Sequence, residues 1–200
     1  MTTTGIDAIR TGSPVTATGG VLFGDVDTAT LPDDAVTPPG ASFTKGGFIG
    51  EDGVTRTIDA SDDKIKAWGG DVVKIVRTEH SITYTWQFLE SANAEVLKLI
   101  NGEENVKIDV EKKHVAVTHT SKIPPRKAFI LDLFDDGAPL REGIPNGQLP
   151  SSGDVNFVHS DVIRYEVTVE AFPEKDFEAP AGSGQKAPKA YSYMGDGPGE

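Results

Sequence analysis

Strict alternation of apolar and polar side chains is the clearest pattern in the chain, and it occurs in two segments. In the first, Ile82, Tyr84, Trp86 and Phe88 alternate with serine, threonine and glutamine. In the second, residues 161–172, apolar positions again recur at every second residue: Ile163, Tyr165, Val167, Val169 and Ala171. Successive side chains of a strand point to opposite faces of its sheet. Both segments therefore predict half-buried strands whose apolar faces form the core.

Shorter β-rich runs between turn residues predict further strands. The run at 72–80 has no turn dipeptide before residue 82, so 72–88 is either one long bent strand or a hairpin turning near 78–81. Two runs around Glu111–Lys113 predict a hairpin, and a buried run ends at Asp135–Gly137, a turn of the hairpin type. About nine strands are expected, the remaining ones within residues 20–24, 42–49, 54–58, 106–110, 115–117 and 126–134.

Residues 91–101 form the one convincing helical pattern. Apolar side chains recur there at helical spacing, and Gly102 follows as a stop signal. Either Ser91 or Asn93 can cap the helix. The segment predicts a helix of about three turns that covers one edge or face of a sheet.

Composition supports many short strands joined by turns. The 200 residues include 22 glycines and 13 prolines, more than the average of about 12% for the two together. The predicted fold is mainly β, a sandwich or flattened barrel with one short flanking α-helix. We expect a single domain over residues 20–172, a flexible N-terminal arm over 1–19 and a flexible C-terminal tail over 173–200.

Charge and cysteine content exclude several functional classes. A net charge of −12 opposes nucleic-acid binding through a basic patch. The chain has no cysteine, which excludes disulfides, thiolate metal sites and cysteine nucleophiles. No apolar run approaches the roughly 20 residues that span a bilayer, and the N-terminus does not resemble a signal peptide. A soluble protein made in a cytoplasm is expected.

No motif predicts catalysis or metal binding. His114 and His119 are five residues apart and would point to opposite faces of one strand. The paired aspartates, such as Asp62–Asp63, match no calcium loop, and neither a nucleophile elbow nor a phosphate loop is present. We expect no catalytic residues, metal or cofactor. Two alternatives stay open: a hydrolase that pairs carboxylates from distant strands, and a carbohydrate- or receptor-binding sandwich, which would need exposed aromatic side chains on one face.

Residues 60–71 are unusual for a self-contained monomer. Trp68 and Ile65 lie in a charged segment that contains the pair Gly69–Gly70. In one interpretation, Trp68 folds back onto the core of its own chain. In the other, the segment is an arm whose apolar residues dock onto a neighbouring copy, because aromatic side chains in polar surroundings are typical of association hot spots.

With this segment included, the chain resembles the major tail tube proteins of long-tailed, non-contractile bacteriophages. The resemblance covers about residues 15–180 and depends on the order of several motifs. These are Phe48–Val54, the segment Asp62–Asp71 with its Ala67–Gly70, the strand end Gln87–Glu90, the helix with Asn93–Leu97, and the strands Arg126–Phe134 and Tyr165–Val169.

The resemblance implies a structural virion protein, not an enzyme. Six copies would close into a ring, and rings would stack into the tube through which DNA passes without specific binding. The implied partners are other copies of the chain and the tape measure, tail terminator and distal tail proteins; no membrane is involved. The subunit would be made in the cytoplasm of the host bacterium and reside in the virion tail.

The resemblance also implies candidate contact residues. The segment 60–71 takes the position of the extended loop that binds the next ring, with these candidates: Asp62, Asp63, Ile65, Trp68, Gly69 and Gly70. Two polar strand faces are candidates for the lumen, Ser81/Thr83/Thr85/Gln87 and Arg164/Glu166/Thr168/Glu170. The second is preferred because its two glutamates would repel DNA phosphates.

Overall fold

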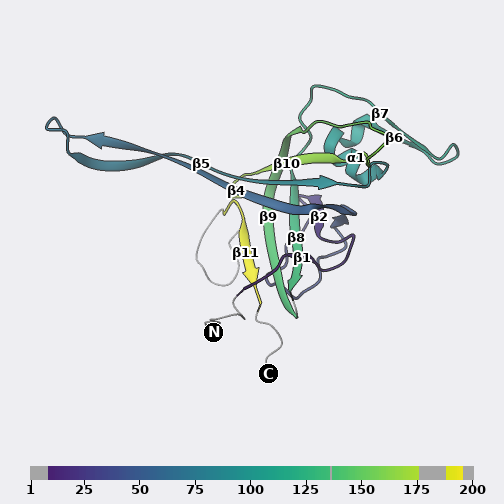
Figure 1. Ribbon diagram of the computed structural model, residues 1–200, viewed down its shortest axis with the longest axis horizontal. Helices are drawn as coiled ribbons and strands as arrows, with labels where there is room; N and C mark the ends of the chain where they lie inside the picture. Colours follow the sequence, from purple (N-terminus) through teal and green to yellow (C-terminus); the bar gives the residue numbers. More distant parts are fainter. Residues whose placement is uncertain (1–8, 136, 176–187, 196–200) are drawn as a thin grey trace.

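The computed structural model describes residues 9–135, 137–175 and 188–195. In this part of the chain the protein is mainly β, with one α-helix, as the sequence predicts. Nine strands form one sheet in the order β3-β2-β8-β9-β10-β5-β4, in which β1 also pairs with β8 and β11 with β9. Strands β6 and β7 form a separate two-stranded sheet. Figure 1 shows β4, β5 and β10 crossing above β8, β9 and β11, so the long sheet folds over into two layers.

The elements have the following bounds: β1 Ser13–Pro14, β2 Val21–Asp25, β3 Thr44–Lys45, β4 Ile49–Lys66, β5 Val72–Phe88, α1 Ala94–Asn101, the 3₁₀ turn η2 Glu103–Asn105, β6 Val106–Asp109, β7 His114–Val117, β8 Lys127–Asp135, β9 Ala138–Ser152, β10 Tyr165–Ala171 and β11 Tyr191–Met194.

The core lies between the two layers and is built on the alternating strands. Tyr84, Trp86 and Phe88 are at most 2% exposed, and Val167, Val169 and Ala171 of β10 are fully buried, whereas Tyr165 at its start is partly buried. The Trp86 ring makes edge-to-face contacts with Phe88 and with Phe129 on β8, at centroid distances of 5.7 and 5.9 Å. The faces predicted from the alternation are therefore confirmed.

The helix α1 is shorter than predicted: it begins at Ala94 rather than at residue 91, and it ends at Asn101 as predicted. The Asn93 side chain accepts a hydrogen bond from the Glu95 amide at 3.0 Å, so Asn93 rather than Ser91 is the N-cap. Gly102 ends the helix with a φ of 89°, a left-handed conformation that favours glycine. Val96, Leu97 and Leu99 are buried, and Val96 and Leu99 belong to the core cluster that the sheet residues form.

Strand β9 is absent from the strands that the sequence predicts. Gly143, Pro145 and Gly147 interrupt residues 140–149, yet β9 extends over 15 residues. Two of the three prolines of β9 fall at register shifts, where the ladder lacks a regular hydrogen bond: Pro145 lies at the shift against β8 and Pro150 at the shift against β10. The third, Pro139, pairs with Phe134 near the start of the strand. Gly147 is needed for close packing, because a Cβ there would lie 2.7 Å from a Val169 methyl carbon.

Regular structure also occurs in both segments expected to lie outside the domain. Ser13–Pro14 pairs with the end of β8, and Tyr191–Met194 pairs with residues 140–143 of β9. The rest of the predicted arm and tail includes residues 1–8, 176–187 and 196–200, which lie outside the described residues.

Candidate assembly surfaces

Strands β4 and β5 form a hairpin that extends far beyond the folded body (Figure 1). The run at 72–88 is one strand, so the alternative of a turn near 78–81 is wrong, and residues 49–66 form its partner. The last pair between β5 and β10 is Thr83 with Glu170; beyond it, β5 pairs only with β4. Nine residues of β4, Ile58–Lys66, lie beyond this pair, toward the tip of the hairpin. At about 3.3 Å per residue, the free part of the hairpin is roughly 30 Å long.

A three-residue turn closes the hairpin at the predicted contact segment. Backbone hydrogen bonds of 2.8 Å join the Ala67 amide to Asp71 and the Gly70 amide to the carbonyl of Ala67. Gly70 has a φ of 93°, which is the left-handed position of a three-residue hairpin loop. Residues predicted as an extended loop are thus mostly strand, and only the tip is a turn.

Trp68 occupies this tip and touches no core. Its relative exposure is 106%, the highest among the exposed apolar residues, so the interpretation in which Trp68 folds back is contradicted in the isolated chain. Other apolar side chains of the hairpin are at least 49% exposed: Ile58, Ile65, Val72, Val73 and Ile75. A Cβ atom added at Gly69 or Gly70 would have no neighbouring atom within 4 Å. The hairpin therefore offers apolar side chains and open space around its tip.

Asp62 and Asp63, the two acidic candidates, lie on opposite faces of β4. Asp62 pairs across the hairpin with Arg77 and binds its guanidinium at 2.9 Å. This hydrogen bond lowers the pKa of Asp62 below its usual value. Asp63 lies opposite Val76. Since Asp62 already has a partner in its own chain, it stabilises the hairpin even before any contact with another copy.

Glu142 on β9 fixes the base of the hairpin. Its carboxylate accepts hydrogen bonds from Arg56 on β4 at 2.6 Å, from the Tyr84 hydroxyl on β5 at 2.8 Å and from Ser192 on β11 at 2.6 Å. Burial, with the nearby Glu142 charge, raises the pKa of Tyr84, so its hydroxyl remains a donor. Both strands of the hairpin are thereby joined to the lower layer, which consists of β8, β9 and β11. This joint sets the direction in which the hairpin projects.

The two polar faces proposed for the lumen are one surface. Cross-strand neighbours point to the same face, and the register pairs Gln87 with Glu166, Thr85 with Thr168, and Thr83 with Glu170. The Thr85 and Thr168 hydroxyls are 3.0 Å apart, and Gln87 donates to Glu166 at 3.2 Å.

Arg164 differs from the other candidates on this face. It precedes β10 and binds both oxygens of the Asp161 carboxylate at 2.6 Å. Its guanidinium charge is thus matched by Asp161, and the two glutamates, Glu166 and Glu170, give the face its negative charge.

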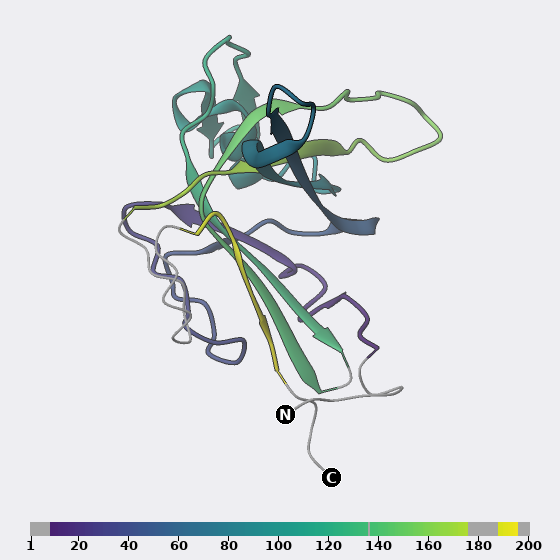
Figure 2. The same ribbon diagram turned by 90° about the vertical axis from the view of Figure 1, so that its left-hand side faces the viewer.

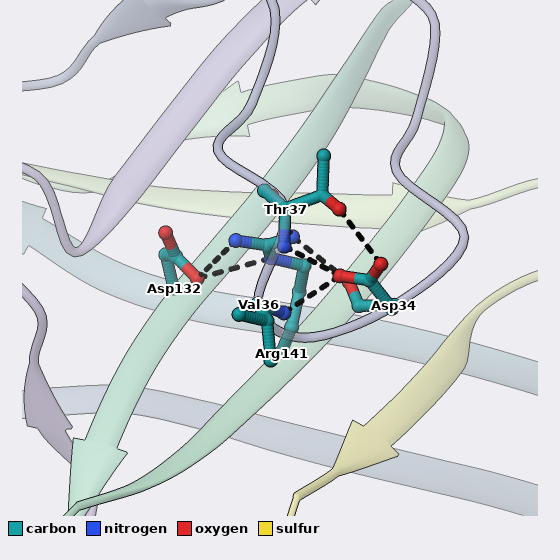
Figure 3. A network of polar contacts seen from close by, with 5 residues as sticks. All are labelled: Asp34, Val36, Thr37, Asp132 and Arg141. Carbon is teal, nitrogen blue, oxygen red and sulfur yellow. Dashed lines mark hydrogen bonds and ion pairs between the residues drawn. The ribbon is translucent and has the colours of Figure 1, made fainter.

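A buried ion pair holds a long loop against the lower layer (Figure 3). Arg141 on β9 is 2% exposed and lies directly opposite Asp132 on β8, whose carboxylate accepts from two guanidinium nitrogens at 2.9 and 3.0 Å. The same guanidinium donates to the carbonyls of Asp34 and Thr37 at 2.8 and 2.7 Å. The Asp34 carboxylate in turn accepts from the amides of Thr37 and Val36, and these bonds lower its pKa. Burial raises the pKa of Asp132, and Arg141 opposes that rise.

Arg141, Asp132 and Glu142 are not among the residues that the sequence predicts to matter. One signal was present: Asp132 interrupts the apolar run Phe129–Phe134, and a carboxylate inside a buried strand requires a cationic partner. Its partner, Arg141, could not be identified from the sequence, because Arg141 lies on β9, whose glycines and prolines do not predict a strand.

The histidines and acids do not converge. His114 begins β7, whereas His119 follows that strand and its ring nitrogen lies 3.1 Å from the Asn101 side-chain oxygen. Within the described ranges, no group of three or more histidine, aspartate or glutamate side chains is placed to hold a metal ion. No helix in those ranges is long and apolar enough to cross a membrane.

Comparisons with known proteins give one family. A sequence model of the family described as "Phage tail tube protein" matches residues 8–182. No curated protein matches the chain. Among solved structures, one chain of "Cryo-EM Structure of an Extracellular Contractile Injection System, PVC sheath-tube complex in extended state" is similar, with 11% identity and a TM-score of 0.43 over 84% of this chain and 94% of that chain.

Proposed function

The chain belongs to the phage tail tube protein family, and from this premise we propose that it is the major tail tube subunit of a long-tailed, non-contractile phage. Six copies form a ring, and stacked rings form the conduit for DNA. The subunit is made in the host cytoplasm and ends in the virion tail, where it contacts its own copies and the tape measure, tail terminator and distal tail proteins.

The projecting hairpin carries this proposal. A two-stranded hairpin alone in water is marginally stable at best, because neither face is covered. This hairpin extends roughly 30 Å without a third strand, and its apolar side chains are exposed at the tip. Such an element gains stability when another surface covers it. Contact with the next ring supplies that surface, with Ile65 and Trp68 as the apolar anchors.

Strand β4 supports closure within a ring. Among the described strands it pairs only with β5, so its other edge is open along 18 residues. Open edges pair readily with other chains unless they are blunted. Charged side chains along β4, such as Asp59 and Lys64, would limit random pairing of the free subunit. In the ring, the open edge joins a neighbouring copy, so that the sheet continues around the tube.

The polar face of β5 and β10 suits the lumen. In the proposed ring it faces inward, with Thr83, Thr85, Gln87, Glu166, Thr168 and Glu170 toward the DNA. Threonines offer no positive charge, and Glu166 and Glu170 repel phosphates. Arg164 stays bound to Asp161, so it adds little attraction for DNA. DNA then passes without adhering to the wall.

Electron microscopy and sedimentation of the purified protein test the proposal. We expect monomers or ring-sized particles at low concentration, and hollow tubes of uniform width at high concentration or after addition of a tail extract. A protein that stays monomeric under all these conditions, seeded ones included, refutes a tube function.

A further inference from the structure

One end of the sheet lies opposite the hairpin tip and has an unexplained surface. Phe88, the last residue of β5, pairs with Ile49 at the start of β4 and with Tyr165 at the start of β10. Segments 48–53 and 153–164 therefore flank the end of β5 on its two sides, and we refer to them together as the far end. In Figure 2 the loop 153–164, in lime green, projects from the body.

The far end exposes apolar side chains on an anchored scaffold. The exposed fractions are 77% for Phe157, 52% for Val158 and 50% for Phe48. Arg164 ties the loop to the sheet, because it binds Asp161 and also donates to the Gln87 side-chain oxygen at 3.3 Å.

Backbone contacts hold the two segments as well. The Gly153 amide donates to the Glu166 carbonyl at 2.9 Å, and the Phe48 amide donates to the Glu90 carboxylate at 3.0 Å. Both ends of loop 153–164 and the start of segment 48–53 are thus anchored to the sheet, which limits the conformational freedom that contact would cost.

Charge makes the far end complementary to the hairpin tip. Residues 64–74 contain Lys64, Lys66 and Lys74 against one acid, Asp71. The far end contains four acids against one base: Glu51, Asp52, Asp154 and Asp161 against Arg164. Opposite charge on two surfaces steers their approach and fixes their orientation.

We propose that the far end of one copy is the docking surface for the hairpin tip, residues 64–74, of a second copy. The proposal rests on the proposed stacking of rings and names the surface that receives the hairpin. The two surfaces lie at opposite ends of one sheet, so the contact is head-to-tail and leaves a free tip and a free far end after each addition. A head-to-tail contact of this kind continues as a filament, and it joins apolar anchors to apolar anchors and lysines to carboxylates.

Phe157→Ser tests the apolar part of the contact. Phe157 is exposed, so the variant should fold like wild type, yet the concentration needed for tubes should rise by about tenfold or more. Val110→Ser is the matched control, because Val110 is 81% exposed on the turn between β6 and β7; its tubes should form as in wild type. A Phe157→Ser protein that polymerises like wild type overturns the proposal.

Cross-linking tests the contact directly, because the chain has no cysteine of its own. Gly69→Cys protein and Asn156→Cys protein are mixed, assembled and treated with a short bis-maleimide. We expect covalent dimers between the two variants in tubes, and none when Glu111→Cys protein replaces Asn156→Cys protein. Tubes without the Gly69–Asn156 cross-link overturn the docking surface and leave the tube function intact, whereas the absence of any wild-type assembly refutes the tube function itself.

Discussion

Replacing Trp68 by alanine separates assembly from folding. The side chain is fully exposed in the single chain, so its loss should change the free energy of unfolding by no more than about 0.5 kcal/mol. Contact with another copy would bury about 200 Å² of the indole, which is worth at most about 5 kcal/mol at 25 cal/mol per Å². Ordering the side chain and desolvating polar neighbours offset part of this. About 3 kcal/mol remains per contact, equivalent to roughly a hundredfold in affinity.

The other tryptophan supplies the matched control. Trp86 is 2% exposed and lies on β5, the same strand that leads to the tip. Trp86→Ala should lower the free energy of unfolding by about 3–5 kcal/mol, since it opens a cavity in the core. In a chain of this size, that corresponds to a fall in Tm of about 10 °C, whereas Trp68→Ala should shift Tm by less than about 2 °C.

Two measurements decide the outcome. Thermal unfolding of dilute protein reports the fold, and sedimentation with electron microscopy at increasing concentration reports polymers. We expect Trp68→Ala to fold normally, to form at most isolated rings and to give no tubes at concentrations where wild type does. If Trp68→Ala unfolds like Trp86→Ala, or if it forms tubes at the wild-type concentration, the role assigned to the tip is wrong.

Three further predictions test the internal structure through chemical or thermal unfolding. Arg141→Met leaves the buried Asp132 carboxylate without its partner and should lower the free energy of unfolding by about 3–5 kcal/mol. Adding Asp132→Leu should restore most of that loss. A double variant as unstable as the single one would contradict the ion-pair account. Gly147→Ala places a methyl group 2.7 Å from a side-chain carbon on β10 and should lower the free energy of unfolding by about 1–3 kcal/mol. Gly69→Ala has open space around the new methyl group and should leave the stability unchanged. Equal effects of the two variants would contradict the close packing at Gly147. The pKa of Asp34 in the folded protein lies below its usual value of 3.8. The stability that the ionised carboxylate adds is therefore complete above pH 3.8 and is lost as the pH falls through the lower pKa of the folded state. Asp34→Asn should reduce the loss of stability between neutral and strongly acidic pH, and a variant with the pH profile of wild type would contradict this role of Asp34.

The two alternating strands were predictable because one face of each is buried. Trp86 and Val167 lie inside while Thr85 and Thr168 lie outside. The alternation of apolar and polar residues along the sequence follows directly from this burial. The helix was predictable for a similar reason, since Asn93 and Gly102 mark its two ends. Local sequence carries these elements because each depends on its own burial pattern and caps.

The hairpin and β9 show where local pattern fails. Beyond Ile58 the hairpin has no buried face, so its charged and apolar residues mix without a period. Its length follows from pairing across the two strands, which a single segment does not reveal. In β9, Pro145 and Pro150 suggested a loop, but they are tolerated at register shifts that arise only when β8 and β10 lie on either side. The ion pair of Arg141 and Asp132 joins β9 to β8, so it could not be predicted without β9.

Amide hydrogen exchange, compared between monomers and assembled protein, tests most directly whether the hairpin is the assembly element. In the monomer, backbone amides of residues 58–80 should exchange quickly, because a two-stranded hairpin with no covered face opens readily. In the assembled protein, we expect protection to rise most over this segment. Assemblies in which the amides of the hairpin exchange as fast as in the monomer would contradict the account.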